Sequence, residues 1–292
     1  MYSIEGRPTR NEFGARAHVP HLFHVKQKPM KTIINWRVFF ILWIAAILSL
    51  IALLPYILEL QSSILLTLDL PIPLPVLIAL QIFQSALLFA ILIFSGMFFA
   101  SRVGLGTPIL DSLTRGAPIA DKVRAILPLS ITLGVIVTLI VLGLEVFIFQ
   151  PALMKELGDT AAALNLQTSQ PAAWKGLLAS FYGGIAEEIQ LRLLVMSFFA
   201  WLGRFISKTA DGKPTNAIFW IANILAALLF GLGHLPAMSM LVPLTPLVIA
   251  RTVLLNGLLG IIFGWLYWRR GLEAAMISHF SADIVLHVLL AL

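Results

Sequence analysis

The sequence predicts an all-α fold, a multi-pass bundle of transmembrane helices. Of its 292 residues, 59% are hydrophobic and 12% are charged, whereas soluble domains carry about 25% charged residues. Several separate apolar runs exceed about 18 residues, the length that an α-helix needs to cross ~30 Å of hydrocarbon. The chain contains no Cys, which excludes a disulfide framework and any metal site with Cys ligands.

The apolar runs and the polar loops between them predict about seven spans. A Pro-rich and Met-rich stretch around Pro236–Pro246 leaves open an eighth, re-entrant or broken segment. The predicted spans are Trp36–Leu60, Leu74–Ala100, Leu127–Gln150, Ala172–Leu202, Ala217–Leu235, Leu247–Trp268 and Leu272–Leu292.

The distribution of Lys and Arg predicts the orientation of these spans. Basic residues are concentrated in the amino-terminal arm, in the second and fourth loops and in the Arg269–Arg270 turn, while the alternate loops carry few of them. Because cytoplasmic loops are enriched in Lys and Arg, we expect a cytoplasmic amino end and an outside carboxyl end. The net charge of +6 then reflects membrane topology, and no nucleic-acid partner is expected.

Three charged residues interrupt the fourth predicted span. A charge at the bilayer centre costs at least ~2.5–3.5 kcal/mol, so Glu187, Glu188 and Arg192 indicate a functional site. Glu188 and Arg192 are four residues apart and are predicted to form an ion pair, which offsets part of that cost. Glu187 is rotated by about 100° and is left without a partner on its own helix, free to take or release a proton. Gly183 and Gly184 would allow a close approach one turn earlier.

Two other predicted spans contribute histidines. Phe230 and His234 lie four residues apart on the fifth span, and His279, Asp283 and His287 share one face of the seventh. We expect Asp283 to hold the His279 imidazole in one orientation, as carboxylates do for catalytic or metal-bound histidines. His287, nearer the end of its span, is expected to be interfacial or to serve helix packing.

The depths of these side chains can be compared by counting residues from the cytoplasmic ends of the spans. At about 1.5 Å per residue, Glu187 and His234 both lie ~25 Å deep, and His279 lies ~13 Å deep. Glu187 and His234 are therefore expected to meet readily, whereas His279 requires helix tilt or a longer reach.

A Glu, two His and an Asp can activate water, because the Glu takes a proton and the imidazoles orient the water or stabilise an oxyanion. The same four side chains, Glu187, His234, His279 and Asp283, could instead bind a divalent metal such as zinc. Residue spacing does not separate these two chemistries. The sequence lacks His-Glu-x-x-His, Gly-x-Gly-Asp and Gly-x-Ser-x-Gly, which are motifs of other hydrolase classes. A third interpretation is a structural polar network that only locks helices together.

The order of these motifs resembles that of the CPBP family. This family includes the CAAX prenyl proteases of the Rce1 type and bacterial Abi-type, bacteriocin-immunity proteins. Each motif alone is weak, but their order on three separate predicted spans is specific, and the resemblance covers roughly residues 172–292. The matching residues are Glu187-Glu188-x-x-x-Arg192, Phe230-x-x-x-His234 and His279-x-x-x-Asp283, together with Gly264–Gly271 leading into Ala275–His279.

The resemblance implies an intramembrane endopeptidase that hydrolyses a peptide bond at or within the membrane. It implies catalytic roles for Glu187, which would activate water, and for His234 and His279. Glu188, Arg192, Phe230 and Asp283 would be supporting residues, and Asp283 stands where the family often has Asn. Some family names refer to metalloproteases, but the CAAX branch resembles a glutamate-type enzyme. No cofactor is therefore favoured, with a divalent metal as the alternative.

This interpretation divides the chain into a basic cytoplasmic arm (1–33), the first three spans with their loops (34–171) and a catalytic membrane-helix core (172–292). The expected partners are the lipid bilayer and a membrane-associated or lipidated protein or peptide substrate. The expected location is the bacterial inner (plasma) membrane. The alternative is a non-catalytic membrane protein, such as a transporter subunit or an immunity-type partner-binding protein. No internal repeat of the kind common in transporters is visible.

Overall fold

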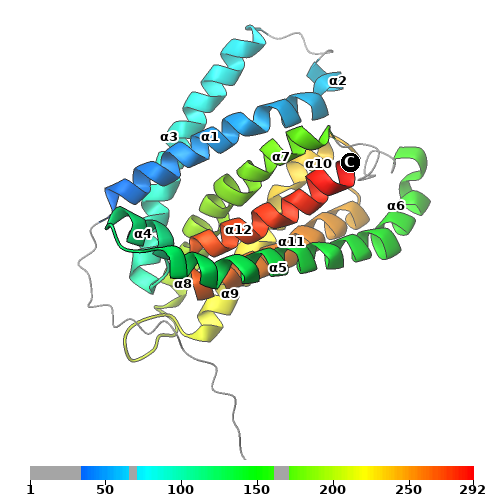
Figure 1. Cartoon of the computed structure of the whole chain (residues 1–292). Coiled ribbons are helices and arrows are strands. Elements are labelled where there is room, and N and C mark those ends of the chain that lie inside the picture. Colours follow the sequence, from blue (N-terminus) through cyan, green and yellow to red (C-terminus); the bar gives the residue numbers. More distant parts are fainter. Residues whose placement is uncertain (1–33, 66–70, 161–170) are drawn as a thin grey trace, which may run out of the picture. The chain divides into compact units, whose positions relative to one another are not determined.

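Helices form nearly all of the regular structure. The computed structural model describes residues 34–65, 71–160 and 171–292, and Figure 1 shows this part of the chain as helices joined by short loops. It contains no strand, only an isolated β-bridge between Lys208 and Pro214. The predicted all-α class is confirmed, while the predicted arm, residues 1–33, lies outside the described residues.

Segments of π-helix continue several of the α-helices without a break. These segments carry the label η, which is also used for the short 3-10 helix η6. The elements are α1 (Trp36–Leu60), α2 (Ser62–Leu65), α3 (Leu74–Val103), α4 (Pro108–Thr114), α5 (Ala120–Leu144), η1 (Glu145–Phe149), α6 (Gln150–Leu157), α7 (Ala173–Phe181), η3 (Tyr182–Glu187), η4 (Ile189–Met196), α8 (Ser197–Gly203), α9 (Asn216–Gly233), α10 (Leu235–Ser239), α11 (Pro246–Arg270), α12 (Leu272–Asp283), η5 (Ile284–Val288) and η6 (Leu289–Ala291).

Within the described residues, six helical segments are long and apolar enough to cross a membrane, and they correspond to the predicted spans one to three and five to seven. The fourth predicted span is present as the continuous helical run α7–η3–η4–α8, which we call the carboxylate helix. Its charged residues distinguish it from the other six. The six segments are Trp36–Leu60, Leu74–Val103, Ala120–Thr160, Asn216–Ser239, Pro246–Arg270 and Leu272–Ala291.

The third and fifth spans differ from their predicted boundaries. The third begins at Ala120 rather than Leu127, because charged residues in its first turn resemble a loop in the sequence but can face water on a helix. Its helix also continues past Pro151, which sits in the first turn of α6, where a missing N–H costs little. The eighth segment considered around Pro236–Pro246 is reduced to the five-residue α10, which follows directly on α9.

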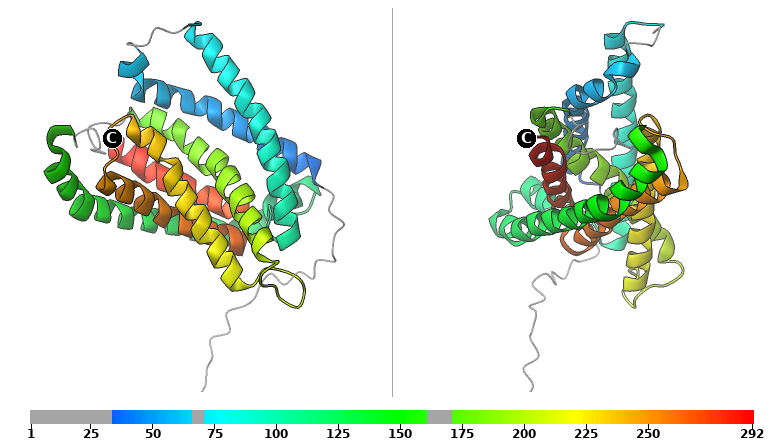
Figure 2. Two further views of the ribbon diagram at one scale, coloured as in Figure 1. Left: turned by 180° about the vertical axis from the view of Figure 1, so that it is seen from behind. Right: turned by 90° about the vertical axis from the view of Figure 1, so that its right-hand side faces the viewer.

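Residues 34–292 form one compact unit, in which α12 packs against α5, α11, α7 and η3. Helices α9 and α11 pair along their lengths, while α1 covers α7 and η3, and α3 covers η4 and α8. Figure 2 shows α3 close to α1 at one end and diverging from it at the other. The carboxylate helix is therefore enclosed by helices from the amino-terminal part of the chain on one side and by α9 and α12 on the other.

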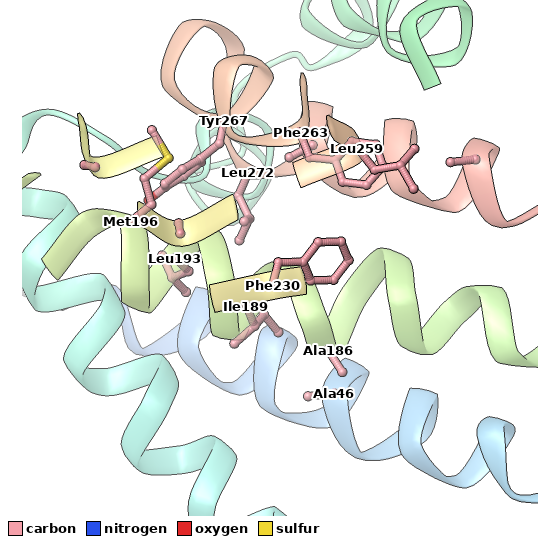
Figure 3. Packing of buried hydrophobic residues seen from close by; sticks show 14 of the residues in the cluster. Ala46, Ala186, Ile189, Leu193, Met196, Phe230, Leu259, Phe263, Tyr267 and Leu272 are labelled. Atoms are coloured by element: carbon pink, nitrogen blue, oxygen red, sulfur yellow. The ribbon is translucent and has the colours of Figure 1, made fainter. Parts of the chain in front are cut away.

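Small side chains bring these helices close together, as expected where helices associate by packing in a membrane. Ala46 of α1 and Ala186 of the carboxylate helix are both fully buried, and Figure 3 shows them at the contact between these two helices. Phe230 of α9 lies between the carboxylate helix, represented by Ile189, and Phe263 of α11. This packed layer forms the wall of the candidate site.

A buried ion pair joins η1 to α11. Arg251 Nε donates to Glu145 Oε2 at 2.7 Å, and a second guanidinium nitrogen donates to Glu145 Oε1 at 2.9 Å. Both side chains are less than a tenth exposed. Such two-point pairing provides geometric specificity as well as energy. The sequence places each residue in a separate predicted span but contains no feature that predicts their pairing.

Two glycines of α5 test the close packing of this helix on α12. A Cβ at Gly134 would overlap the backbone carbonyl of Ser278, whereas a Cβ at Gly143 would meet nothing within 4 Å. We expect Gly134→Ala to lower the free energy of unfolding by about 1–3 kcal/mol, the usual cost of overpacking. Gly143→Ala should raise it by up to about 1 kcal/mol. Thermal unfolding of both variants in one detergent provides the comparison, and equal midpoints would contradict the prediction.

Candidate active site

The carboxylate helix contains two successive π-helical segments that meet at Glu188. π-Helical turns are rare in proteins, and those that occur are often found at functional sites. In a regular α-helix, neighbouring side chains point about 100° apart, so Glu187 and Glu188 would face different partners. Here both carboxylates approach the same imidazole, that of His279 on α12.

His279 is held between carboxylates on both of its ring nitrogens. Its Nδ1 lies 2.8 Å from Glu188 Oε1, and because an ionised carboxylate only accepts, we assign the proton of this bond to Nδ1. Its Nε2 lies 3.7 Å from Glu187 Oε2 and 3.7 Å from Asp283 Oδ1. Glu188 therefore makes the short contact with His279 at Nδ1, and Asp283, which was predicted to hold this imidazole, lies beside the opposite nitrogen.

Aromatic rings fix the plane of the His279 imidazole. Phe263 stacks on it with ring centroids 4.5 Å apart and an angle of 20° between the ring planes. Phe230 meets it edge to face at 5.5 Å. Phe263 is absent from the predicted site because nothing in its spacing distinguishes it from an ordinary apolar residue of the span.

The predicted ion pair between Glu188 and Arg192 is confirmed. Arg192 Nε lies 3.3 Å from Glu188 Oε2, and both side chains are completely buried. The guanidinium also donates to the Gly260 carbonyl at 3.1 Å. Its Cζ lies 5.0 Å and 5.5 Å from the ring centroids of Phe230 and Phe263, within the range of cation–π attraction. Glu188 therefore connects Arg192 and His279 and is shared between them.

His234 lies at the carboxyl end of α9 and is half-buried. Its Nδ1 is 2.8 Å from the Phe230 carbonyl oxygen, which can only accept, so Nδ1 carries a proton and Nε2 is left available. The edge of the Phe230 ring separates the two histidines, with centroids 4.8 Å from His234 and 5.5 Å from His279. Of the predicted set, Glu187, His279 and Asp283 are brought together, and His234 lies across Phe230 from them.

Glycine provides the space for this assembly. A Cβ at Gly183 would overlap the Asp283 carboxylate and would lie 3.0 Å from His279 Nε2, and a Cβ at Gly184 would lie 3.0 Å from Phe280. The close approach predicted for this glycine pair is therefore to α12. Any side chain larger than hydrogen at position 183 would displace the polar groups of the site.

The two adjacent carboxylates differ in access to their surroundings. The Glu188 side chain is fully buried, while 23% of the Glu187 side chain is exposed. The accessible polar atoms of the site are the Glu187 carboxylate and the Nε2 of His234.

The possibility of a metal site can be checked against the grouping of ligand side chains. Among the residues that the structure describes, no three His, Asp or Glu side chains are grouped so as to hold one metal ion.

The unequal burial of the two carboxylates predicts unequal effects on stability. Glu188→Ala leaves Arg192 buried without its counter-charge and should lower the free energy of unfolding by about 3–5 kcal/mol. Glu187→Ala removes a partly exposed side chain with no contact shorter than 3.7 Å to His279 and should cost about 1 kcal/mol or less. Thermal unfolding in detergent measures both, and an equal loss in the two variants would contradict the assignment of Glu188 as the structural carboxylate.

Comparison with known families identifies the part of the chain that holds this site. Residues 169–285 match the family model described as "Type II CAAX prenyl endopeptidase Rce1-like". No curated protein and no solved structure matches the chain. Together with the six apolar spans, the match indicates an integral membrane protein. The resemblance predicted from the three motifs is thus confirmed over residues 169–285, the segment that is similar to Rce1-like CAAX prenyl endopeptidases.

Proposed function

We propose that this protein is an intramembrane endopeptidase in which Glu187 activates the water that hydrolyses the peptide bond. The observation that carries the proposal is the difference between the two neighbouring carboxylates. Glu188 is committed to Arg192 and His279, whereas Glu187 is partly exposed and faces His279 Nε2 without a short contact. A general base needs such a position, because it must reach the water molecule from which it takes a proton.

In the proposed reaction, Glu187 takes a proton from water as the water oxygen attacks the carbonyl carbon. The accessible Nε2 of His234 orients this water. His279 in its protonated form donates from Nε2 to the oxyanion of the tetrahedral intermediate, and Asp283 stabilises that form of the ring. Glu187 then returns the proton to the leaving nitrogen as the carbon–nitrogen bond breaks. Glu188 and Arg192 hold His279 and do not exchange protons with the substrate.

The proposed substrate is a membrane-associated or lipidated protein or peptide. Two considerations support this choice, the position of the site within apolar helices and the prenyl endopeptidase family that the region matches. A substrate anchored by a lipid reaches a bilayer-embedded site by diffusion in the membrane plane, whereas a soluble peptide must first partition into the bilayer. The proposed setting is the plasma membrane of a bacterium.

Replacing Glu187 with Gln tests the role of this carboxylate. Glu187→Gln keeps the size of the side chain and removes the base, so cleavage of a farnesylated peptide ending in Cys-aliphatic-aliphatic-X should fall by about 10²-fold or more. The matched control is Glu156→Gln on the exposed face of α6, which should cleave at the wild-type rate. Fluorescence of a quenched peptide reports the rate in detergent or vesicles. Full activity in a folded Glu187→Gln variant would reject the proposal in favour of a non-catalytic polar network.

A chelator tests whether the reaction needs a metal ion. We propose a metal-free mechanism, because Glu187 can take the proton from water and His279 can meet the developing charge. Cleavage should therefore be unchanged after prolonged treatment with EDTA or 1,10-phenanthroline, and elemental analysis should give less than about one tenth of a metal ion per chain. Activity that is lost on chelation and restored by zinc would replace this mechanism with a metal-dependent one at the same residues.

A further inference from the structure

A second polar contact lies beyond the Glu187 site and involves the first helix. The Tyr56 hydroxyl near the end of α1 is 3.3 Å from His287 Nδ1, and the two rings meet edge to face with centroids 5.6 Å apart. Both side chains are half-buried. Neither belongs to the proposed reacting groups, and both lie outside the residues matched by the family model. An ordinary packing contact between apolar helices would not require this hydrogen bond.

The contact is linked to the site through one turn of helix. His287 lies in η5, a π-helical turn that begins directly after Asp283, whose carboxylate is 3.7 Å from His279 Nε2. The Asp283 carboxylate thus faces His279 on its own helix and Gly183 on the carboxylate helix. The direction of the Asp283 side chain therefore depends on the path of this turn.

Three neighbouring contacts leave the turn little freedom. Gly176 of α7 lies directly against the His287 carbonyl, since a Cβ there would overlap it, and Gly183 lies in the same way against the Asp283 carboxylate. Tyr56 closes the turn from α1, immediately after Pro55, whose ring removes one backbone hydrogen bond from that helix. The turn is thus held at its backbone by Gly176 and at the His287 side chain by Tyr56, while Gly183 contacts the carboxylate of Asp283 just before it.

We propose that Tyr56 and His287 are positioning residues for the candidate site. Their hydrogen bond fixes η5 and thereby keeps the Asp283 carboxylate beside His279 Nε2 and Glu187. The inference rests on the proposed hydrolytic function, and it assigns the first helix of the chain a role in the chemistry of the last.

Tyr56→Phe removes the hydroxyl and keeps the ring. We expect kcat for the farnesylated peptide to fall roughly three- to tenfold, the ratio that corresponds to one ordinary hydrogen bond, with KM unchanged. The matched control is Tyr267→Phe, which removes a buried hydroxyl bonded to Ser197 at 2.8 Å, outside the candidate site. This control should lose a similar amount of thermal stability and keep the wild-type kcat. Equal kcat values in Tyr56→Phe and wild type would overturn the inference.

Two further comparisons separate positioning from simple destabilisation. In the Asp283→Asn background, Tyr56→Phe should have little additional effect on kcat, because coupled residues are not additive; a full additional loss would overturn the inference. His287→Gln, which keeps a hydrogen-bonding group for Tyr56, should retain more activity than His287→Leu, and equal loss would also overturn it. If Glu187→Gln abolishes cleavage while Tyr56→Phe has no effect, the proposed function stands and only this inference fails. Full activity in Glu187→Gln overturns both.

Discussion

The shared carboxylate of Glu188 is the interaction on which the rest of the site depends. It accepts a hydrogen bond from His279 and faces the buried Arg192 guanidinium, so it compensates one charge and orients one ring at the same time. Burying Arg192 without it would cost several kcal/mol. The surrounding features serve the same need, since the Gly260 carbonyl accepts from the guanidinium and two Phe rings cover it. Glu187, in contrast, is partly exposed and lies 3.7 Å from His279 Nε2.

The helix that presents these groups departs from regular α-helical geometry where they are needed. Its π-helical segments bring adjacent carboxylates to opposite nitrogens of one imidazole. Helix α12 shows a similar irregularity, because the π-helical turn η5 begins directly after Asp283. Glycines on the carboxylate helix let the two helices approach until backbone and side-chain polar atoms touch. The geometry of the site therefore comes from paired irregularities in two helices that pack closely.

Sequence patterns predict the class of this fold well because apolar length is a local property. The predicted spans agree with the helices except at some boundaries, where a charged first turn (α5) or a proline in a first turn (α6) resembles a loop. The ion pair of Glu188 and Arg192 was also predictable, since both residues lie on one helix. The position of His279 was not, because counting residues along straight helices places it about 12 Å from the depth of Glu187, while in the structure the two side chains lie 3.7 Å apart. Pairings between distant helices, such as Glu145 with Arg251 or Tyr56 with His287, cannot be predicted from sequence periodicity, which reports only on residues of the same helix.

The order in which the chain is synthesised gives the Glu188–His279 contact a further consequence. The carboxylate helix emerges well before α12, which supplies the imidazole, so a growing chain holds Arg192 and two carboxylates with one ion pair and an excess negative charge. Lipid cannot solvate that charge, and the fifth to seventh spans must pack around it before it is compensated. The contacts of Glu187 and Glu188 with His279 can therefore form only after the last helix has been synthesised. A chain that ends before α12 would leave both carboxylates without their imidazole partner.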